Sequence, residues 1–485
     1  MRGVSEAYFD PDFDALIDRI NPPGVVVDNE TCEDCTLVKV DSANRDGILL
    51  EMVQVLTDLD LLISKSYISS DGGWLMDVFH VTDQLGNKIT DRGMIHSIQQ
   101  SFTPAPKSAS PRHHHHHHHH QQSEYNSDSA CCTCAAATTT TTTIEVAAAD
   151  RPGLLSEIAA VLAALGCRVS SCRAWTHNSR AAAVLDVHDR AAAVDPRRLA
   201  DIEQQVRGVV GAHSDGPGDR MRVAVSSPSP SGRVHTERRL HQMMREDGDY
   251  EEMTTAAAAA AATETRVTID RWAERGYWVV GVRSLDRPKL LFDTVCALTD
   301  MRYVVFHAAV GSHGHLAIQE YYIRHKDGCS LDSESERRRV TRCLVAAVER
   351  RVSHGLRLDV RAIDRPGLLS DVTRVFRENG LSLARAECAT RGERAVGTFY
   401  VTDASGCREV DPKAVEAVRR EVGGGIVLEV NKDAPSRSPA EKKIRAQTHG
   451  IGIGSASSLE EARPRNSLGS ILWSQIERLS GFIRS

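Results

Sequence analysis

Four short loops of this sequence have the residue types that could hold a small charged ligand. Residues 150–153 and 364–367 both read Asp-Arg-Pro-Gly, while residues 44–47 and 286–289 read Asn-Arg-Asp-Gly and Asp-Arg-Pro-Lys. Each loop joins a strand-like run to a helical pattern. The first turn of a helix presents unpaired backbone N–H groups and a positive dipole end, which favour a carboxylate. Glycine lets a ligand approach the backbone, and the acid or amide could accept a hydrogen bond from an ammonium group.

Three of these loops have both the glycine and the acid or amide. Their candidate ligand-binding residues, each taken with the first helical residue, are Asn44, Gly47, Ile48, Asp150, Gly153, Leu154, Asp364, Gly367 and Leu368. In the fourth loop Lys289 replaces the glycine. Its side chain would crowd the loop or pair with the carboxylate, so this loop is the weakest of the four candidates.

A purely structural interpretation of the same loops stays open at this point. Aspartate is a good helix cap, proline is favoured in a first helical turn, and glycine eases a tight corner. The motif could therefore mark only the change from strand to helix.

The elements around the loops repeat four times along the chain. In the fourth copy, residues 356–363 alternate apolar and polar side chains, as a half-buried strand does. Residues 367–379 place Leu368, Leu369, Val372, Val375 and Phe376 on one face of a helix. Two strands around a turn, a second helix and a last strand follow. The predicted order in every copy is βαββαβ, a ferredoxin-like α+β fold with an antiparallel sheet.

The four copies define four predicted domains separated by compositionally poor segments. Unit one covers residues 36–101, unit two 143–227, unit three 277–350 and unit four 356–431. The remaining segments are predicted as a low-complexity linker (102–142), a linker with a helical segment (228–276), and a polar tail ending in an amphipathic helix (432–485). The poor composition of the linkers predicts disorder. Because the second helix of unit three runs directly into unit four, we expect these two units to fold as one block.

Composition excludes several classes of protein. The 485 residues are 41% hydrophobic and 26% charged, with a net charge of −6, which gives no electrostatic support for a nucleic-acid partner. No secretory or transit peptide is recognisable at the N-terminus, and no run of about 18 apolar residues predicts an integral membrane segment. Twelve cysteines without a secretory signal indicate reduced thiols. We therefore expect a cytoplasmic or nuclear protein.

The four units together resemble the plant ACT-domain-repeat proteins. The marks of this resemblance are the four Asp-Arg-Pro-Gly-like loops, "DGGWLMDVFHVTD" at 71–83, "HTERRLHQMM" at 235–244 and the final "LGSILWSQIERLSGFIRS". ACT domains are βαββαβ modules that bind amino acids and regulate metabolic enzymes. The resemblance implies a free amino acid as the ligand, held between neighbouring units. It also implies side-by-side pairing of sheets, within one chain or in a homo-oligomer.

Metal and catalytic motifs are incomplete. Residues 32–35 and 131–134 both have the C-x-x-C spacing of half a zinc site, but no second pair follows within about 15 to 20 residues. The eight histidines at 113–120 lie in a low-complexity linker. His188-Asp189 stands at a strand end, and no phosphate loop or nucleophile elbow is present. We predict no metal, no cofactor and no catalytic residues.

Three functional hypotheses follow. The main one is a non-enzymatic amino-acid sensor whose ligand changes the packing between units and so the interaction with a protein partner not identified by the sequence. The second is an interaction scaffold without a ligand, and the third is an enzyme of amino-acid or nucleotide metabolism. The C-terminal amphipathic helix could dock on the chain itself, bind another protein or lie on a membrane surface.

Overall fold

The computed structural model describes residues 23–71, 73–102, 141–189, 195–212, 220–227, 234–251, 265–328, 331–352, 355–405, 410–423 and 425–431. Nearly all of the linker predicted at 102–142, with its histidine run and second C-x-x-C, lies outside the described residues. The tail predicted at 432–485, with its amphipathic helix, also lies outside them. None of the helices in the described part of the chain combines the length and the apolar character that a bilayer crossing demands.

Two eight-stranded antiparallel sheets organise the chain, so the α+β class is confirmed. The strand order is β1-β2-β4-β3-β11-β12-β10-β9 in the first sheet and β16-β13-β15-β14-β6-β7-β5-β8 in the second. The strands of the first sheet are β1 Gly24–Asp28, β2 Thr36–Ala43, β3 Leu62–Asp71, β4 Trp74–Thr82, β9 Arg266–Trp272, β10 Tyr277–Leu285, β11 Tyr303–His313 and β12 Leu316–His325. Those of the second are β5 Thr141–Ala149, β6 Arg168–His177, β7 Arg180–His188, β8 Arg222–Ser226, β13 Leu356–Ile363, β14 Leu381–Arg391, β15 Arg394–Asp403 and β16 Ile426–Asn431.

Helices cover one face of each sheet, and one further helix lies between the two halves. The first helix of each unit is, in chain order, α2 Ile48–Asp58, α4 Leu154–Ala164, α8 Leu290–Asp300 and α10 Leu368–Glu378. The second is α3 Arg92–Ser101, α5 Pro196–Gly211, α9 Glu334–Glu349 and α11 Pro412–Glu421. Helix α6, Thr236–Glu246, belongs to none of the units.

Each sheet joins two units that are not consecutive in the sequence. Strand β3 of unit one pairs with β11 of unit three, and β6 of unit two pairs with β14 of unit four. The expectation that units three and four fold as one block is therefore wrong. An edge strand exposes a row of unpaired backbone groups, and either neighbour could satisfy them. Units one and three have one order of elements, and units two and four have another. The pairing thus joins units of the same order.

Units two and four have the predicted order βαββαβ, but units one and three do not. Their outer strands, β1 and β9, come before the rest of the unit and pair with β2 and β10. Strand β9 thus lies in the range predicted as a linker, and β1 lies before the range predicted for unit one. Helix α9 leads within a few residues into β13, so the chain cannot return from it to the edge of unit three. The alternation in "RVTIDRW" was the signal that could have located β9.

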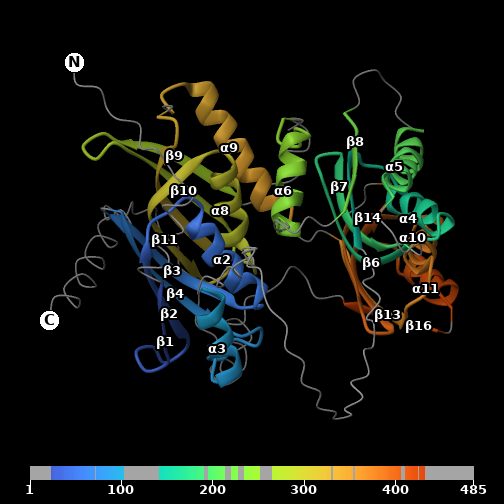
Figure 1. Cartoon of the computed structure of the whole chain (residues 1–485), viewed down its shortest axis with the longest axis horizontal. Coiled ribbons are helices and arrows are strands. Elements are labelled where there is room, and N and C mark those ends of the chain that lie inside the picture. The colour runs from blue at the N-terminus through green and yellow to red at the C-terminus, as the bar shows by residue number, and fades with distance from the viewer. Residues whose placement is uncertain are drawn as a thin grey trace, which may run out of the picture.

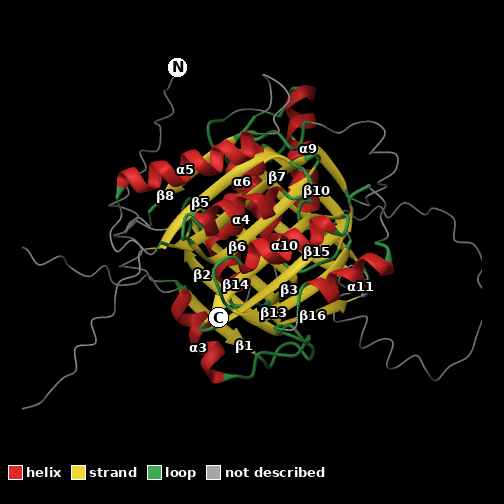
Figure 2. Cartoon of the chain, turned by 90° about the vertical axis from the view of Figure 1, so that its right-hand side faces the viewer, coloured by secondary structure: helices red, strands yellow, loops and turns green. Residues whose placement is uncertain are grey.

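The elements stack in five layers, which Figure 1 shows from side to side as sheet, helices, α6, sheet and helices. In Figure 2, α4 and α10 run next to each other across the strands of the second sheet. Their contact is part of one continuous core that combines apolar side chains of units two and four. A second core combines units one and three in the same way. Each pair of units therefore buries its apolar surface as a single body.

Helix α6 connects the halves by using two different faces. Its apolar side chains Leu240, Met243 and Met244 are buried against Trp175 and Val184 on the strand face of the second sheet. Its polar face meets α8 and the connection between α9 and β13. The side chains that meet at this polar face are charged, so this side of α6 is held by ion pairs rather than by apolar packing.

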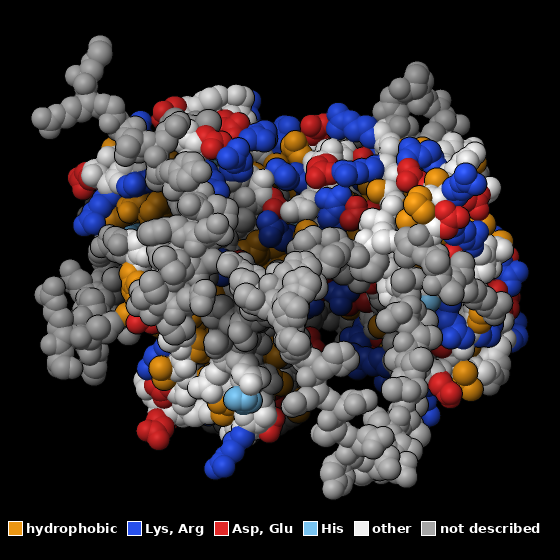
Figure 3. Space-filling model, in the orientation of Figure 1, with side chains coloured by type: hydrophobic (Ala, Val, Ile, Leu, Met, Phe, Trp, Pro, Cys, Tyr) orange, Lys and Arg blue, Asp and Glu red, His pale blue; other side chains and the backbone are white. Residues whose placement is uncertain are grey.

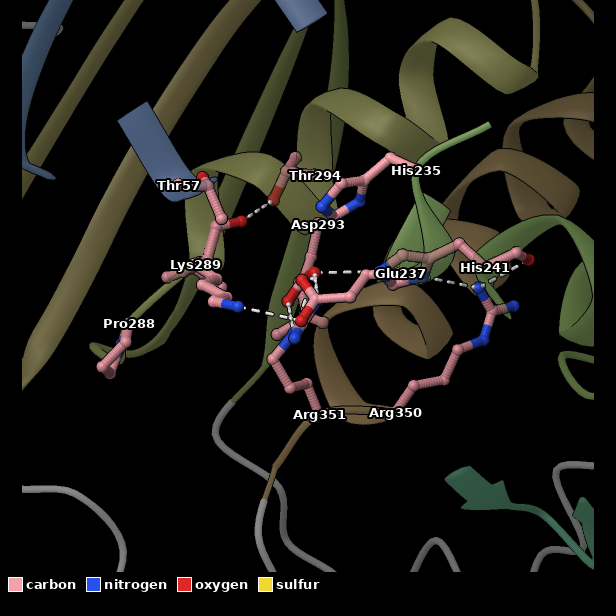
Figure 4. A network of polar contacts seen from close by, with 12 residues as sticks. Thr57, His235, Glu237, His241, Pro288, Lys289, Asp293, Thr294, Arg350 and Arg351 are labelled. Atoms are coloured by element: carbon pink, nitrogen blue, oxygen red, sulfur yellow. Dashed lines mark hydrogen bonds and ion pairs between the residues drawn. The ribbon is translucent and has the colours of Figure 1, made fainter. Parts of the chain in front are cut away.

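Those ion pairs form a buried network, drawn in Figure 4. The Arg351 guanidinium donates to Glu237 at 3.0 Å and to both carboxylate oxygens of Asp293, the Nε–Oδ2 distance being 2.9 Å. His241 Nε2 lies 2.9 Å from Asp293 Oδ1. All four side chains are at most 2% exposed. Burial alone would raise the pKa of Glu237, but Arg351, Lys289 and Arg173 hold this pKa well below its usual range.

A second pair extends the network toward unit two. Arg350 donates from two nitrogens to the two oxygens of Asp249, both at 2.6 Å. Asp249 also lies 2.9 Å from Nδ1 of His177, at the end of β6. We name the whole set of Glu237, His241, Asp249, Asp293, Arg350 and Arg351 the joint. It ties α6, unit three and unit two at one place.

Removing one charge from the joint should destabilise the protein strongly. Arg351→Ala leaves the Glu237 and Asp293 carboxylates buried without their shared guanidinium, which should cost about 3–5 kcal/mol of unfolding free energy. Arg338→Ala is the matched control, because Arg338 is 71% exposed and its pair with Glu334 is screened by solvent, so its loss should change stability little. Chemical denaturation of the two variants measures both values. Equal effects would contradict the structural role of the joint.

Candidate functional site

The residue before the first helix of every unit has a left-handed backbone. The φ angles are 76° at Gly47, 85° at Gly153, 79° at Gly367 and 65° at Lys289. A residue with a Cβ adopts this conformation at a cost of about 1–2 kcal/mol, so glycine is favoured by the backbone alone. Lys289 adopts the conformation in spite of that cost.

No side chain caps these four helices. Three of the second helices are instead capped by aspartates, since Asp91, Asp195 and Asp411 accept hydrogen bonds from the first turns of α3, α5 and α11. For α2, α4, α8 and α10 the cap is the left-handed residue itself, without a side-chain hydrogen bond. Asp150 and Asp364 therefore do not act as the helix caps that the structural interpretation of the loops required. The N-terminal ends of these helices stay without a side-chain acceptor.

The acid or amide of each loop is fixed beside the hairpin of its own unit. The backbone N–H of this residue donates to the hairpin turn at 2.8 Å in all four units, namely from Asn44, Asp150, Asp286 and Asp364 to Gly73, Ser179, His315 and Glu393. The side chain thus starts from the same position in each unit.

The arginine of each loop has a structural partner that the sequence analysis missed. It forms an ion pair with the acid six residues later, in the first turn of the helix. The four pairs are Arg45–Glu51, Arg151–Glu157, Arg287–Asp293 and Arg365–Asp371. The recurring spacing of six was the available signal. Each arginine neutralises an acid that would otherwise repel a ligand carboxylate at the helix start.

A cavity lies at the loop of unit four, against unit two. Its volume is about 60 Å³, and Asp364, Gly367 and Leu368 line it on one side. The other side is formed by Ala159 and Ala163 of α4, together with the start of β6. A Cβ placed on Gly367 would lie 3.7 Å from the Ala163 Cβ, so the loop and the neighbouring unit are in close contact.

A matching cavity of about 50 Å³ lies at the loop of unit two, against unit four. Asp150, Gly153 and Leu154 line it, and Thr373 and Phe376 of α10 close it from the other unit. The two cavities are therefore related by the same approximate symmetry as the two units. The structure places the three candidate residues of unit two and the three of unit four beside a neighbouring unit, and their role as ligand-binding residues stays a prediction.

The two aspartates differ in their electrostatics. Burial raises the pKa of Asp150 to about 6, although a hydrogen bond from the Arg151 backbone partly opposes this rise. The Asp364 side chain is 7% exposed, and its Oδ2 lies 3.5 Å from Nε of Arg168 in unit two. This oxygen accepts no hydrogen bond from any described residue. Both carboxylates are thus poorly solvated and would gain from an ammonium group.

The loops of units one and three have different surroundings. A Cβ placed on Gly47 would meet nothing within 4 Å, so Asn44, Gly47 and Ile48 stay a prediction based on the loop alone. In unit three, the ammonium group of Lys289 donates to Glu237 of α6 at 2.8 Å. The Lys289 side chain, which the sequence analysis expected to crowd the loop or pair with a ligand carboxylate, is therefore paired with a carboxylate of the chain itself.

The His188-Asp189 pair has a structural role in the described residues. His188 is the last residue of β7, and Asp189 accepts from Arg198 of α5 at 2.9 Å. This agrees with its interpretation as a strand end.

Comparison with known proteins decides the family. A model described as the ACR family N-terminal ACT domain matches residues 31–108, and an ACT domain model matches residues 356–423. The ACT domain-containing protein ACR3 of Arabidopsis thaliana is 49% identical over 446 residues, which cover 91% of this chain and 94% of that protein. This chain belongs to the family of ACT domain-containing ACR proteins. ACR1 of the same organism is 46% identical and covers 98% of both chains.

Membership of the ACR family points to an amino-acid-binding regulatory role, and neither matching family model describes a catalytic domain. A bifunctional uridylyltransferase/uridylyl-removing enzyme of Rhodospirillum rubrum is also 32% identical, over 91 residues. This match covers 19% of the ACR-family chain and 10% of the enzyme.

The raised pKa of Asp150 predicts a pH-dependent stability. The folded state binds a proton at this carboxyl up to about pH 6, whereas the unfolded chain releases it near about pH 4. The wild type therefore loses stability as the pH rises through this window. Relative to Asp150→Asn, this loss should be about 1 kcal/mol between about pH 5 and about pH 7.5, as measured by chemical denaturation.

Unit one provides the control for this prediction, because it has an amide at the same position. Asn44→Ala removes no titratable group, so its effect on stability should not change between about pH 5 and about pH 7.5. A stability difference between the wild type and Asp150→Asn that does not change with pH would contradict the prediction.

Proposed function

We propose that the protein is an amino-acid sensor without catalytic activity, and that units two and four bind two ligand molecules at their shared interface. The proposal rests on the matched pair of cavities. Each has the same left-handed backbone before the helix, a helix start without a side-chain cap, and a poorly solvated aspartate. The ligand carboxylate would lie at the start of α4 or α10. Its ammonium group would bind Asp150 or Asp364.

Such a ligand would contact both units at once. In the cavity of unit four, the loop comes from one unit and Ala159 and Ala163 from the other. A ligand shifts an equilibrium only by the difference between its affinities for the two arrangements. Because closing the cavity requires both units, binding would favour the arrangement in which they are tightly paired.

Strand β6 offers a physical connection from the ligand to the joint. Ala174 and Thr176 line the cavity of unit two. Between them, the fully buried Trp175 packs against Met243 of α6, and the guanidinium of Arg351 lies 4.7 Å from the centre of its ring. The cavity and the joint thus share one strand. A change in the pairing of units two and four would therefore shift the position of α6. This shift would change the surface that the protein presents to a partner protein.

The ligand-free scaffold is the competing function, and a titration separates the two. The full-length chain is titrated with each of the twenty amino acids by thermal shift and then by calorimetry. A sensor should gain about 2.7 kcal/mol of stability at 100 times the dissociation constant, with about two ligand molecules per chain. Gly153→Ala and Gly367→Ala should each remove about one of them, because a Cβ on the left-handed residue strains the loop beside the cavity.

Two glycines at the other ends of the same helices are matched controls. Gly166→Ala and Gly380→Ala have φ angles of 77° and 71° and place the new Cβ in open space. They should lower the free energy of unfolding by about 1 kcal/mol through the left-handed strain alone and keep both ligand molecules. The match is closest for Gly367→Ala, because a Cβ on Gly153 would also collide with the Arg377 side chain. If no amino acid shifts the stability at millimolar concentration, or if the loop variants bind as the wild type does, the scaffold is the better description.

Asp364 should provide much of the affinity for the ammonium group in unit four. Asp364→Asn keeps the shape of the side chain and removes its charge, so the affinity of that site should fall about 10- to 100-fold. Calorimetry with the amino acid identified above measures the loss. The corresponding hydroxy acid, which has no ammonium group, should bind weakly to the wild type and should not be weakened further by the substitution. An equal loss for both ligands would contradict the assigned contact.

A further inference from the structure

Three potential metal ligands meet at one end of unit one. Cys32 and Cys35 lie in the connection between β1 and β2, and His80 lies in β4. The two sulfur atoms and a ring nitrogen of His80 are all within 4.8 Å of one another. Nδ1 of His80 is buried and has no hydrogen-bond partner among the described residues. This group is separate from the ligand cavities and from the joint.

The sheet register explains how a histidine so distant in sequence reaches the two cysteines. His80 is directly opposite Leu37 in the pairing of β2 with β4. Cys35 lies just before β2 and two residues before Leu37, so continuing the alternation of the strand by one residue places the Cys35 side chain on the Leu37 face, diagonal to His80. Cys32 is three residues before Cys35, and the connection turns so that the Cys32 sulfur also lies within 4.8 Å of the other two ligand atoms.

The connection that carries the cysteines is held in place by other contacts. Asp28 accepts from the backbone of Glu30 at 2.8 Å and from Thr31, which forms a turn just before Cys32. Behind the turn, Asn29 donates to the carbonyl of Ile89 at 2.9 Å. Both cysteines are free thiols. The three ligands are thus presented by a preformed loop and a strand, a rigid support of the kind that metal sites need.

We propose that Cys32, Cys35 and His80 bind a thiophilic divalent cation, with Zn²⁺ as the best fit. Two thiolates and one imidazole are ligands that zinc prefers, and their mutual separation suits a tetrahedral ion with one open position. Binding releases the two thiol protons to solvent. The ion would link the β1–β2 connection, just before the start of β2, to β4. It would thereby secure the outer strand β1, which reaches the sheet from outside the predicted unit.

Cobalt is a suitable probe because Co²⁺ takes the geometry of Zn²⁺ and absorbs light. The histidines at 113–120 and the cysteines at 131, 132 and 134 could bind the probe as well. The experiment therefore uses the full-length chain with all of these residues replaced by serine, freed of metal and kept in a non-thiol reductant. Titration with Co²⁺ should produce thiolate-to-metal charge transfer and the intense visible bands of a tetrahedral site. The bands should saturate at a single equivalent per chain and disappear when Zn²⁺ is added.

Variants locate the site and keep the test decisive. Cys32→Ser and His80→Asn should each weaken Co²⁺ binding by at least about 10-fold. His96→Asn, an exposed histidine of α3 in the same unit, should bind as the parent does. Far-ultraviolet circular dichroism checks that each variant is folded. If Cys32→Ser or His80→Asn does not fold, Cys35→Ser is used in its place. The proposal is overturned if the parent shows no thiolate–cobalt absorption, or if this absorption survives in both Cys32→Ser and His80→Asn.

Discussion

The pairing of edge strands is the constraint on which the rest of this structure depends. The β3, β6, β11 and β14 edges carry backbone N–H and C=O groups that need a partner, and in each unit that partner is the unit two places away in the sequence. Pairing β3 with β11 and β6 with β14 produces two continuous sheets, and it also places helices of different units against each other. Both of the large apolar cores then contain side chains from two units. A single unit would leave one side of its helices and one edge of its sheet in water.

The same pairing makes the four loops unequal, although their backbones are alike. The loops of units two and four lie against the helix of the other unit, and a cavity forms at each of them. In unit three the corresponding loop is connected to the joint, because Glu237 accepts hydrogen bonds from both Lys289 of the loop and Arg351. Buried ion pairs of this kind are sensitive to the loss of any member. The cavities at these loops thus lie in the half made of units two and four, whereas one loop of the other half contributes to connecting the halves.

Charge is distributed differently inside and outside the protein. Figure 3 shows basic and acidic side chains interspersed along the upper part of the visible face, where their fields largely cancel. Inside, by contrast, the joint concentrates Asp249, Asp293 and Glu237 against Arg350 and Arg351 with almost no exposure. Each carboxylate there has a pKa held below its usual range by the neighbouring guanidinium groups, against the effect of burial. The joint therefore keeps its charges, and with them its geometry, at every physiological pH.

Local patterns in the sequence were sufficient for the loops and for the elements of units two and four, and for all but the outer strand of units one and three. Alternation predicts β13, apolar spacing predicts α10, and the glycine of residues 364–367 marks the left-handed turn, because these features depend on neighbours a few residues away. The partners across the structure depend on contacts between distant residues, which local patterns do not contain. Tertiary structure decided which units pair and that β1 and β9 complete their sheet. It also decided that Glu237 contacts Lys289 and that His80 lies beside Cys32 and Cys35. For the paired units, the outer strands and the His80 contact, a sheet brings together strands that are far apart in the sequence, and the register of their pairing decides which side chains meet. For Glu237 and Lys289 the deciding contact is the packing of α6 against the start of α8, which local patterns equally do not contain.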